Sequence, residues 1–162
     1  MRRIWSEQAK FSTWRRLWVA LAQAQMELGV PGITPKMIEA MKKKINDIDF
    51  EEAEKQERLL RHDVMAHIHA FGRQVPDTNQ IKLKTEAARI IHFGATSCFV
   101  QDNGDLCLMK EGGDVLKGKL LKLMQALRNN CLEYHRLPCL GYTHLQPAQL
   151  TTYKKKKKKK IN

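Results

Sequence analysis

The sequence predicts an all-α fold of the helical-bundle type. Apolar residues recur at steps of three and four along most of the chain, and no stretch alternates with the period of two that a strand requires. With 162 residues, 43% of them hydrophobic, the chain is long enough to bury the core of one domain.

The first two helices are predicted by their caps and their apolar faces. A stripe of aromatic and aliphatic side chains predicts a helix from Ser6 to Leu28, which Gly29 and Pro31 end. The dipeptide Thr34-Pro35 predicts the cap and first turn of a second, short helix.

The third predicted helix begins after Asp49, a capping residue, and runs to Phe71, with Gly72 as its stop. At 100° per residue, His62 and His69 fall together on the face opposite the apolar line of this helix. From residues 73 to 89 the periodicity fails, which predicts an irregular, exposed segment.

A long fourth helix is expected from a cap at or near Ser97 to about Tyr134. Gly112 and Gly113 weaken its middle, by about 1 kcal/mol each relative to alanine. Its apolar seam consists of Leu106, Met109, Leu116, Leu120, Leu123, Leu127 and Cys131.

Charge and cysteine usage narrow the class of protein. The formal net charge is +12, but Lys154 to Lys160 supply seven of these charges, which leaves +5 for the rest. Like charges in a lysine homopolymer repel one another, so we expect a disordered tail. No aromatic residues are interleaved with these lysines, as they are in many nucleic-acid-binding proteins, which argues against specific nucleic-acid binding.

The four cysteines form no Cys-x-x-Cys pair, and no apolar run suits a membrane span or signal peptide. We expect a soluble, cytoplasmic protein with reduced cysteines and no membrane partner.

Three polar segments interrupt the apolar pattern: Arg61-His62-Asp63, Gly94-Ala95-Thr96-Ser97 and Thr143-His144-Leu145-Gln146. A guanidinium group, hydroxyl groups beside a helix start and an imidazole are what an anionic ligand requires. Pro147 suits the first turn of another helix, which would place His144 just before its N-terminus. The alternatives are a solvated helix face, a capped helix start and an ordinary loop. The histidine spacing does not suit a metal site.

Taken in order, four segments closely resemble the adenylosuccinate lyases of the fumarase/aspartase superfamily. The resemblance covers most of positions 5 to 152. Its blocks are Phe11 to Arg15, Leu60 to His67, Ile91 to Ser97 and Leu137 to Thr152.

This resemblance implies an almost wholly helical subunit of a homotetramer, in which each active site takes residues from three subunits. The implied reaction is β-elimination of fumarate from adenylosuccinate, giving AMP, and from the succinylated aminoimidazole carboxamide ribotide of purine biosynthesis. The implied partner is therefore a purine nucleotide that carries a succinyl group, and no metal or organic cofactor is implied.

The resemblance also assigns roles to residues. His144 matches the general acid that protonates the departing nitrogen, and His62 matches an assisting histidine. Arg61 and Asp63 match substrate-binding positions beside His62. The remaining implied substrate-binding residues are Thr96, Ser97, Thr143 and Gln146.

The sequence departs from the family pattern in ways that predict a fragment. The serine base of the family lies in a signature of the form Ser-Ser-x-Met-Pro-x-Lys-x-Asn-Pro, which these 162 residues lack. We expect an N-terminal domain over 1–95 with an irregular insertion at 73–89, the start of a central long-helix domain over 96–152, and a tail over 153–162. Alternatives to an enzyme fragment are a non-catalytic chain that associates with full-length subunits and non-specific nucleic-acid binding through the tail.

Overall fold

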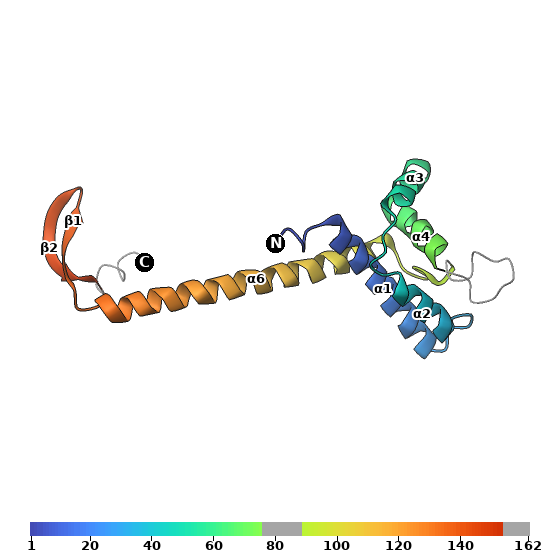
Figure 1. Ribbon diagram of the computed structural model, residues 1–162, viewed down its shortest axis with the longest axis horizontal. Coiled ribbons are helices and arrows are strands. Elements are labelled where there is room, and N and C mark those ends of the chain that lie inside the picture. The colour runs from blue at the N-terminus through green and yellow to red at the C-terminus, as the bar shows by residue number, and fades with distance from the viewer. Residues whose placement is uncertain (76–88, 154–162) are drawn as a thin grey trace. The chain divides into compact units, whose positions relative to one another are not determined.

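The computed structural model describes residues 1–75 and 89–153 (Figure 1). It divides into two compact units, Met1–Gly112 and Gly113–Asn162, whose boundary falls within one helix, α6. The two units are described separately below. The prediction of a boundary near residue 95 stays a prediction, and the predictions for the lysine tail and most of the 73–89 segment lie outside the described residues.

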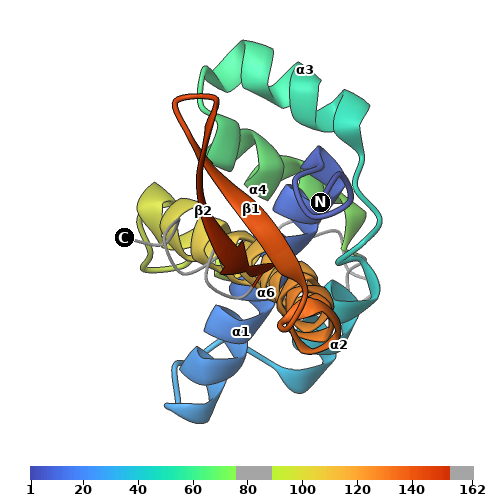
Figure 2. The same cartoon turned by 90° about the vertical axis from the view of Figure 1, so that its left-hand side faces the viewer.

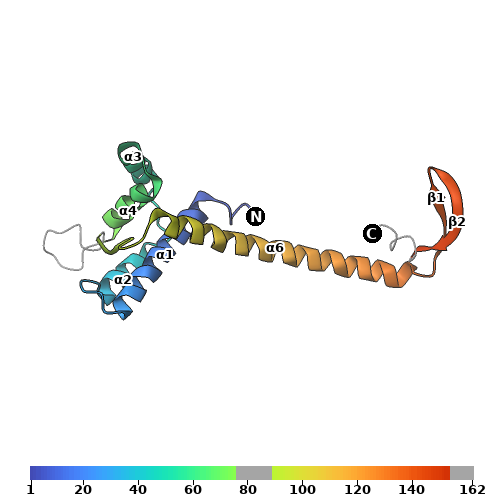
Figure 3. The same cartoon turned by 180° about the vertical axis from the view of Figure 1, so that it is seen from behind.

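The first two helices confirm the predictions made from their caps. Helix α1 spans Glu7–Glu27, and its N-cap Ser6 accepts a hydrogen bond from the Ala9 amide. Helix α2 spans Pro35–Lys43, with Thr34 as N-cap and proline in the first turn. The two helices lie side by side (Figure 3).

The prediction of a single helix over 49–71 is wrong, because the chain forms two helices there. Helix α3 spans Phe50–Leu60, capped by Asp49 as expected, and α4 spans Asp63–Gln74. Arg61 ends α3 in the left-handed conformation (φ 55°), and His62 is extended and caps α4. The wheel that paired His62 with His69 therefore does not apply, because the two residues are not on one continuous helix.

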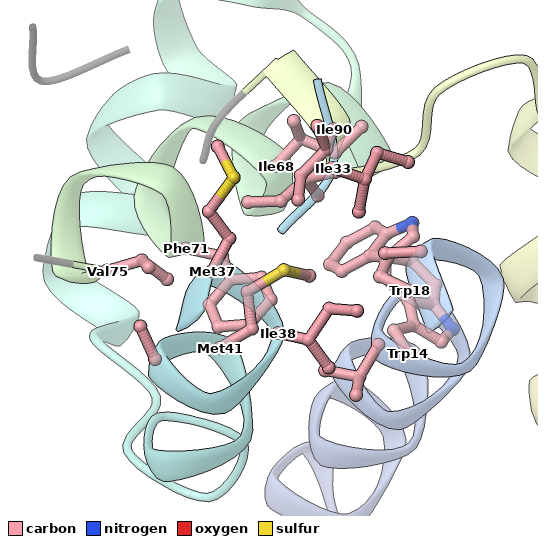
Figure 4. Close-up of a cluster of buried hydrophobic side chains, with 14 of the residues drawn as sticks. Trp14, Trp18, Ile33, Met37, Ile38, Met41, Ile68, Phe71, Val75 and Ile90 are labelled. Atoms are coloured by element: carbon pink, nitrogen blue, oxygen red, sulfur yellow. The ribbon is translucent and has the colours of Figure 1, made fainter. Parts of the chain in front are cut away.

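The core of the first unit lies among α1, α2, α4 and the segment that leads into α6 (Figure 4). Trp14, Trp18 and Phe71 are fully buried at its centre, and the Trp18 and Phe71 rings stack 6.1 Å apart. The apolar stripe predicted along the first helix thus faces the core.

A buried arginine joins three segments beside this core. Arg15 is 1% exposed, and its guanidinium donates to the carbonyl oxygens of Lys44 and Asp47 at 2.5 and 2.7 Å. It also donates to Gln74 Oε1 at 2.7 Å and lies over the Phe71 ring. Burial lowers the pKa of Arg15 to about 10, a fall that Asp47 and Asp49 oppose, so the group is still charged at neutral pH.

Helix α6 runs without interruption over Ser97–Tyr134, through both glycines that were expected to weaken it. Within the first unit its buried residues are Val100, Gly104, Leu108 and Gly112, whereas Leu106 and Met109 of the predicted seam are exposed. The spacing of four residues puts Gly104 against Trp14 and Gly112 against Trp5.

The second unit contains the rest of α6 and an antiparallel hairpin (Figure 2). Strand β1 spans Pro138–Thr143 and β2 spans Gln146–Thr152, joined by the turn at His144 and Leu145. The base of the hairpin is closed by a hydrogen bond from the Tyr153 amide to the Leu137 carbonyl, at 3.1 Å. Tyr134 and Tyr153 also meet edge to face there.

The hairpin corrects two predictions: that the chain has no strand, and that Pro147 begins a helix after His144. His144 and Leu145 both have positive φ, of 50° and 66°, which is the backbone of a two-residue hairpin turn. Pro147 lies opposite Tyr142 beside an irregularity in the register at Gly141, where a missing N–H is tolerated. The prediction of a mainly helical fold is otherwise confirmed.

Among the described residues, no helix is both long and apolar enough to cross a membrane.

Candidate functional site

The N-termini of two helices converge at one polar site in the first unit. His62 caps α4, and Ser97 is the first residue of α6. Their side chains meet, with His62 Nε2 3.1 Å from Ser97 Oγ. Two of the segments singled out in the sequence, 35 residues apart, are therefore brought together by the fold.

A second contact joins the same two helices. Gln101, one turn into α6, donates from Nε2 to Asp63 Oδ2 at 3.2 Å. The other carboxylate oxygen of Asp63 accepts the Val64 amide at 2.7 Å. The carboxylate is thus held on both sides at the start of α4.

Arg61 lies at the corner between α3 and α4, next to His62 in the chain. Its positive φ of 55° turns the chain there, and its side chain is exposed. Arg61 and Thr96 are the chain neighbours of His62 and Ser97, and a guanidinium, hydroxyl groups and helix N-termini are groups that favour a bound anion.

The segment before α6 is fixed by two hydrogen bonds from α1. Trp18 Nε1 donates to His92 Nδ1 at 3.0 Å, and Gln25 Nε2 donates to the Phe93 carbonyl at 2.8 Å. His92 and Gly94 both have positive φ, which gives the tight turn that leads to Thr96 and Ser97. Partial burial lowers the pKa of His92, and the charge of His62 acts in the same direction.

A pocket of about 700 Å³ lies beside this turn in the first unit. Its lining is mainly apolar, from Met65, Ile68, Ile91 and Phe93, with His69, Arg73, Arg89 and His92 adding polar groups. Arg73 is paired with Glu52. His69, predicted on the polar face, thus lines this pocket.

His144 lies in the second unit, at the tip of the hairpin. Thr143 and Gln146 are cross-strand partners that flank the turn, and all three side chains are exposed. No helix begins after His144, so the predicted place of this residue just before a helix N-terminus is wrong. The turn instead presents the imidazole to solvent.

Sequence reasoning missed three residues that position the first-unit site: Trp18, Gln25 and Gln101. Trp18 belonged to a predicted apolar stripe, and its indole N–H gave no sign of a polar partner. Gln25 is polar but lies at helical spacing from Trp18 and Leu21 of that stripe, and a polar residue at such a position can indicate a specific partner. Gln101 lies four residues after Ser97, on the same helix face, and this spacing was also available.

Comparison with known proteins places these features in a family. A family model described as Lyase matches residues 1–157. Adenylosuccinate lyase of Saccharomyces cerevisiae is 47% identical over 149 residues, which is 91% of this chain and 29% of that protein. Adenylosuccinate lyase of Schizosaccharomyces pombe is 44% identical over 96% of this chain and 31% of its own length. The chain thus spans about a third of these relatives.

Solved structures agree on the fold. The β-carboxy-cis,cis-muconate cycloisomerase of Acinetobacter calcoaceticus superimposes with a TM-score of 0.77 at 25% identity, covering 95% of this chain and 35% of that one. A fumarate lyase from Mesorhizobium superimposes with the same score at 20% identity, over 96% of this chain and 34% of its own. With a family match along nearly its whole length and the same fold in these enzymes, the chain belongs to the Lyase family.

Proposed function

We propose that this chain is part of an adenylosuccinate lyase, which eliminates fumarate from adenylosuccinate to give AMP and from the succinylated aminoimidazole carboxamide ribotide. The observation that carries the proposal is the meeting of His62 and Ser97 at 3.1 Å. This contact joins two of the segments that resemble adenylosuccinate lyases, Leu60 to His67 and Ile91 to Ser97, at the N-termini of α4 and α6. The 47% identity to the yeast enzyme supports the same substrate.

The substrate-binding half of the site lies in the first unit. Arg61, His62 and Asp63 bind the substrate at the start of α4, and Thr96 and Ser97 bind a succinyl carboxylate at the start of α6. A carboxylate is the ligand that two helix N-termini, hydroxyl donors and a guanidinium favour together.

His144 is the general acid, with Thr143 and Gln146 beside it in substrate binding. In the elimination, the C–N bond breaks and its electron pair goes to the nitrogen, which takes a proton from His144. The neighbouring C–H bond supplies the electrons of the new double bond of fumarate, and its proton passes to a base. The serine signature of the family is not found in this sequence, so we expect no turnover from the chain alone.

The wider biological setting is also a proposal. We place the protein in the cytoplasm, in AMP and purine biosynthesis, as part of a homotetramer whose sites combine copies. In such an assembly, His144 of one copy serves the His62 site of another.

Complementation tests this function. A full-length adenylosuccinate lyase in which the counterpart of His144 is replaced by alanine is mixed with the 162-residue chain, and the loss of adenylosuccinate is followed. We expect the chain to restore turnover, because it supplies the missing imidazole to a shared site. The chain on its own should give no turnover.

Two matched variants make the result specific. A His144→Ala chain should restore nothing, whereas His135→Ala, which removes a half-buried histidine outside the site, should act like the unaltered chain. Equal rescue by the His144→Ala chain would refute the assignment of the acid. Turnover by the isolated chain above that of its His144→Ala variant would show that it holds a base of its own.

A second candidate function is association with full-length subunits without catalysis. The second half of α6 favours it, because Leu116, Leu120 and Leu123 are 54% to 58% exposed in the chain. Exposed apolar surface of this kind marks protein interaction sites. Size-exclusion chromatography with the full-length enzyme tests it, and failure to co-elute would exclude this role.

A further inference from the structure

Both ring nitrogens of His62 have hydrogen-bond partners, and these partners determine which nitrogen carries the proton of the neutral ring. Nδ1 lies 3.4 Å from the Met65 amide as the N-cap acceptor of α4, and Nε2 lies 3.1 Å from Ser97 Oγ. A backbone N–H can only donate, so Nδ1 has to be the unprotonated nitrogen. In the neutral ring the proton is then on Nε2, which donates to Ser97 Oγ.

Asp63 is the group that would favour the opposite tautomer, because a carboxylate close to Nδ1 would stabilise a proton there. Its Oδ1 is 3.6 Å from His62 Nδ1, which is beyond hydrogen-bond range. The carboxylate is instead held by the Val64 amide and by Gln101 Nε2. The Val64 amide holds Oδ1, the oxygen nearer to Nδ1, and Gln101 holds Oδ2, so together they keep Asp63 from competing for Nδ1.

The position of His62 as the N-cap of α4 also favours the tautomer with the proton on Nε2. A proton on Nδ1 would remove the acceptor for the Met65 amide, which is the N-cap hydrogen bond of α4. The cap therefore favours the tautomer with its proton on Nε2.

We propose that His62 is a positioning residue that the α4 cap holds in the Nε2–H tautomer, and that it turns the Ser97 hydroxyl hydrogen toward a carboxylate oxygen of the ligand. Ser97 Oγ accepts from the imidazole, so its own O–H is available to donate away from the ring. Gln101 is a second positioning residue, acting through Asp63. The carboxylate ligand rests on the proposed function, whereas the tautomer does not.

Nitrogen-15 NMR of the histidine rings tests the tautomer in the 162-residue chain at neutral pH. We expect Nδ1 of His62 to resonate as an unprotonated ring nitrogen and Nε2 as an N–H. Ser97→Ala should leave this tautomer in place, because the cap sets it, while Gln101→Leu should increase the share of the Nδ1–H form. A His62 ring that is mainly Nδ1–H in the unaltered chain would overturn the proposal.

Two substitutions at position 62 separate the cap from the donor. Asparagine has its acceptor close to where Nδ1 lies and is a favoured N-cap, whereas glutamine reaches toward Ser97 but caps poorly. We expect His62→Asn to keep the melting temperature and His62→Gln to lower it. The reverse order, or equal losses, would contradict a capping role for Nδ1.

Titration with succinate, used as the probe dicarboxylate, tests whether the Ser97 hydroxyl donates to a carboxylate of the ligand. We expect succinate to shift the Ser97 amide and the His62 Nε2 signals, Ser97→Thr to keep the response because it keeps the hydroxyl, and Ser97→Ala to lose it. An undiminished response in Ser97→Ala, or no response in the unaltered chain, would overturn the role of the Ser97 hydroxyl. These readouts need no turnover, so they are independent of the complementation assay.

Discussion

His67 is a buried imidazole that lies outside the proposed site. It is 5% exposed and stacks on Phe11 with ring centroids 3.6 Å apart, and its Nδ1 has no partner among the described residues. Burial lowers its pKa from 6.5 to about 4, helped by the positive charges of Arg15 and Lys10 and opposed by Asp63. The folded chain therefore holds this histidine neutral.

This predicts a loss of stability in mild acid. The unfolded chain binds a proton at His67 near pH 6.5 and the folded chain only near pH 4, so folding becomes less favourable as the pH falls between these values. From pH 7 to pH 5 the loss due to His67 is about 2 kcal/mol. Urea unfolding followed by tryptophan fluorescence measures it.

The matched variants are His67→Phe and His69→Phe. The first removes the buried titrating group and should flatten the pH dependence, whereas the second changes an exposed histidine and should leave it. Identical pH dependence in both variants would show that another group causes the acid loss.

Arg15 gives a second prediction at this scale. Arg15→Met leaves the Lys44 and Asp47 carbonyls without their donor, so we expect the free energy of unfolding to fall by about 3 kcal/mol. Arg16→Met, at the exposed next position, should change it by less than about 0.5 kcal/mol. Equal effects in urea unfolding would exclude the role of Arg15 as a link between segments.

At the residue level, the sequence was enough to select Arg61, His62, Asp63 and Ser97, because charged and hydroxyl groups interrupt an apolar pattern there. It could not show that His62 contacts Ser97, since that contact depends on how α4 packs against the start of α6. The roles of these residues stay predictions until they are tested.

Two glycines of α6 lie in different surroundings, so that substituting each of them compares the effect of close packing on stability with the effect of helix propensity. A methyl group added at Gly104 would lie 3.1 Å from Trp14 Cδ1, and Trp14 is fully buried among other rings. A methyl group added at Gly113 would meet nothing within 4 Å.

We therefore expect Gly104→Ala and Gly113→Ala to change stability in opposite directions. Overpacking against Trp14 outweighs the gain in helix propensity, which predicts a net loss of about 1 kcal/mol at Gly104. At Gly113 only propensity acts, which predicts a gain of up to about 1 kcal/mol. Thermal unfolding followed by circular dichroism would decide, and a gain at both positions would mean that Trp14 can move aside.

Helices were predicted well where a cap and an apolar stripe agreed, as for α1, α2 and the start of α3. The break at Arg61 was missed because it contains neither glycine nor proline, and an arginine rarely takes positive φ. The hairpin was missed because Pro147 suits a helix start as well as an irregular strand, and because the turn residues His144 and Leu145 are not the usual Asn-Gly.

For the whole molecule, the exposed apolar face of α6 predicts self-association. Leu120 and Leu127 are 57% and 43% exposed, with further leucines between them. We expect the chain to sediment as concentration-dependent oligomers, and Leu120→Glu to shift it toward the monomer because the charge opposes burial. Asn130→Glu adds the same charge at an exposed polar position and should leave the distribution unchanged.

The hydrogen bond that closes the base of the hairpin suggests that the hairpin can be made as a cyclic peptide. Because the Leu137 carbonyl and the Tyr153 amide are hydrogen-bonded, the two ends of this segment are close enough for a short covalent link. A macrocyclic peptide excised from positions 137–153 would carry the His144 imidazole at its apex, where the acidity of that group could be titrated apart from the helices.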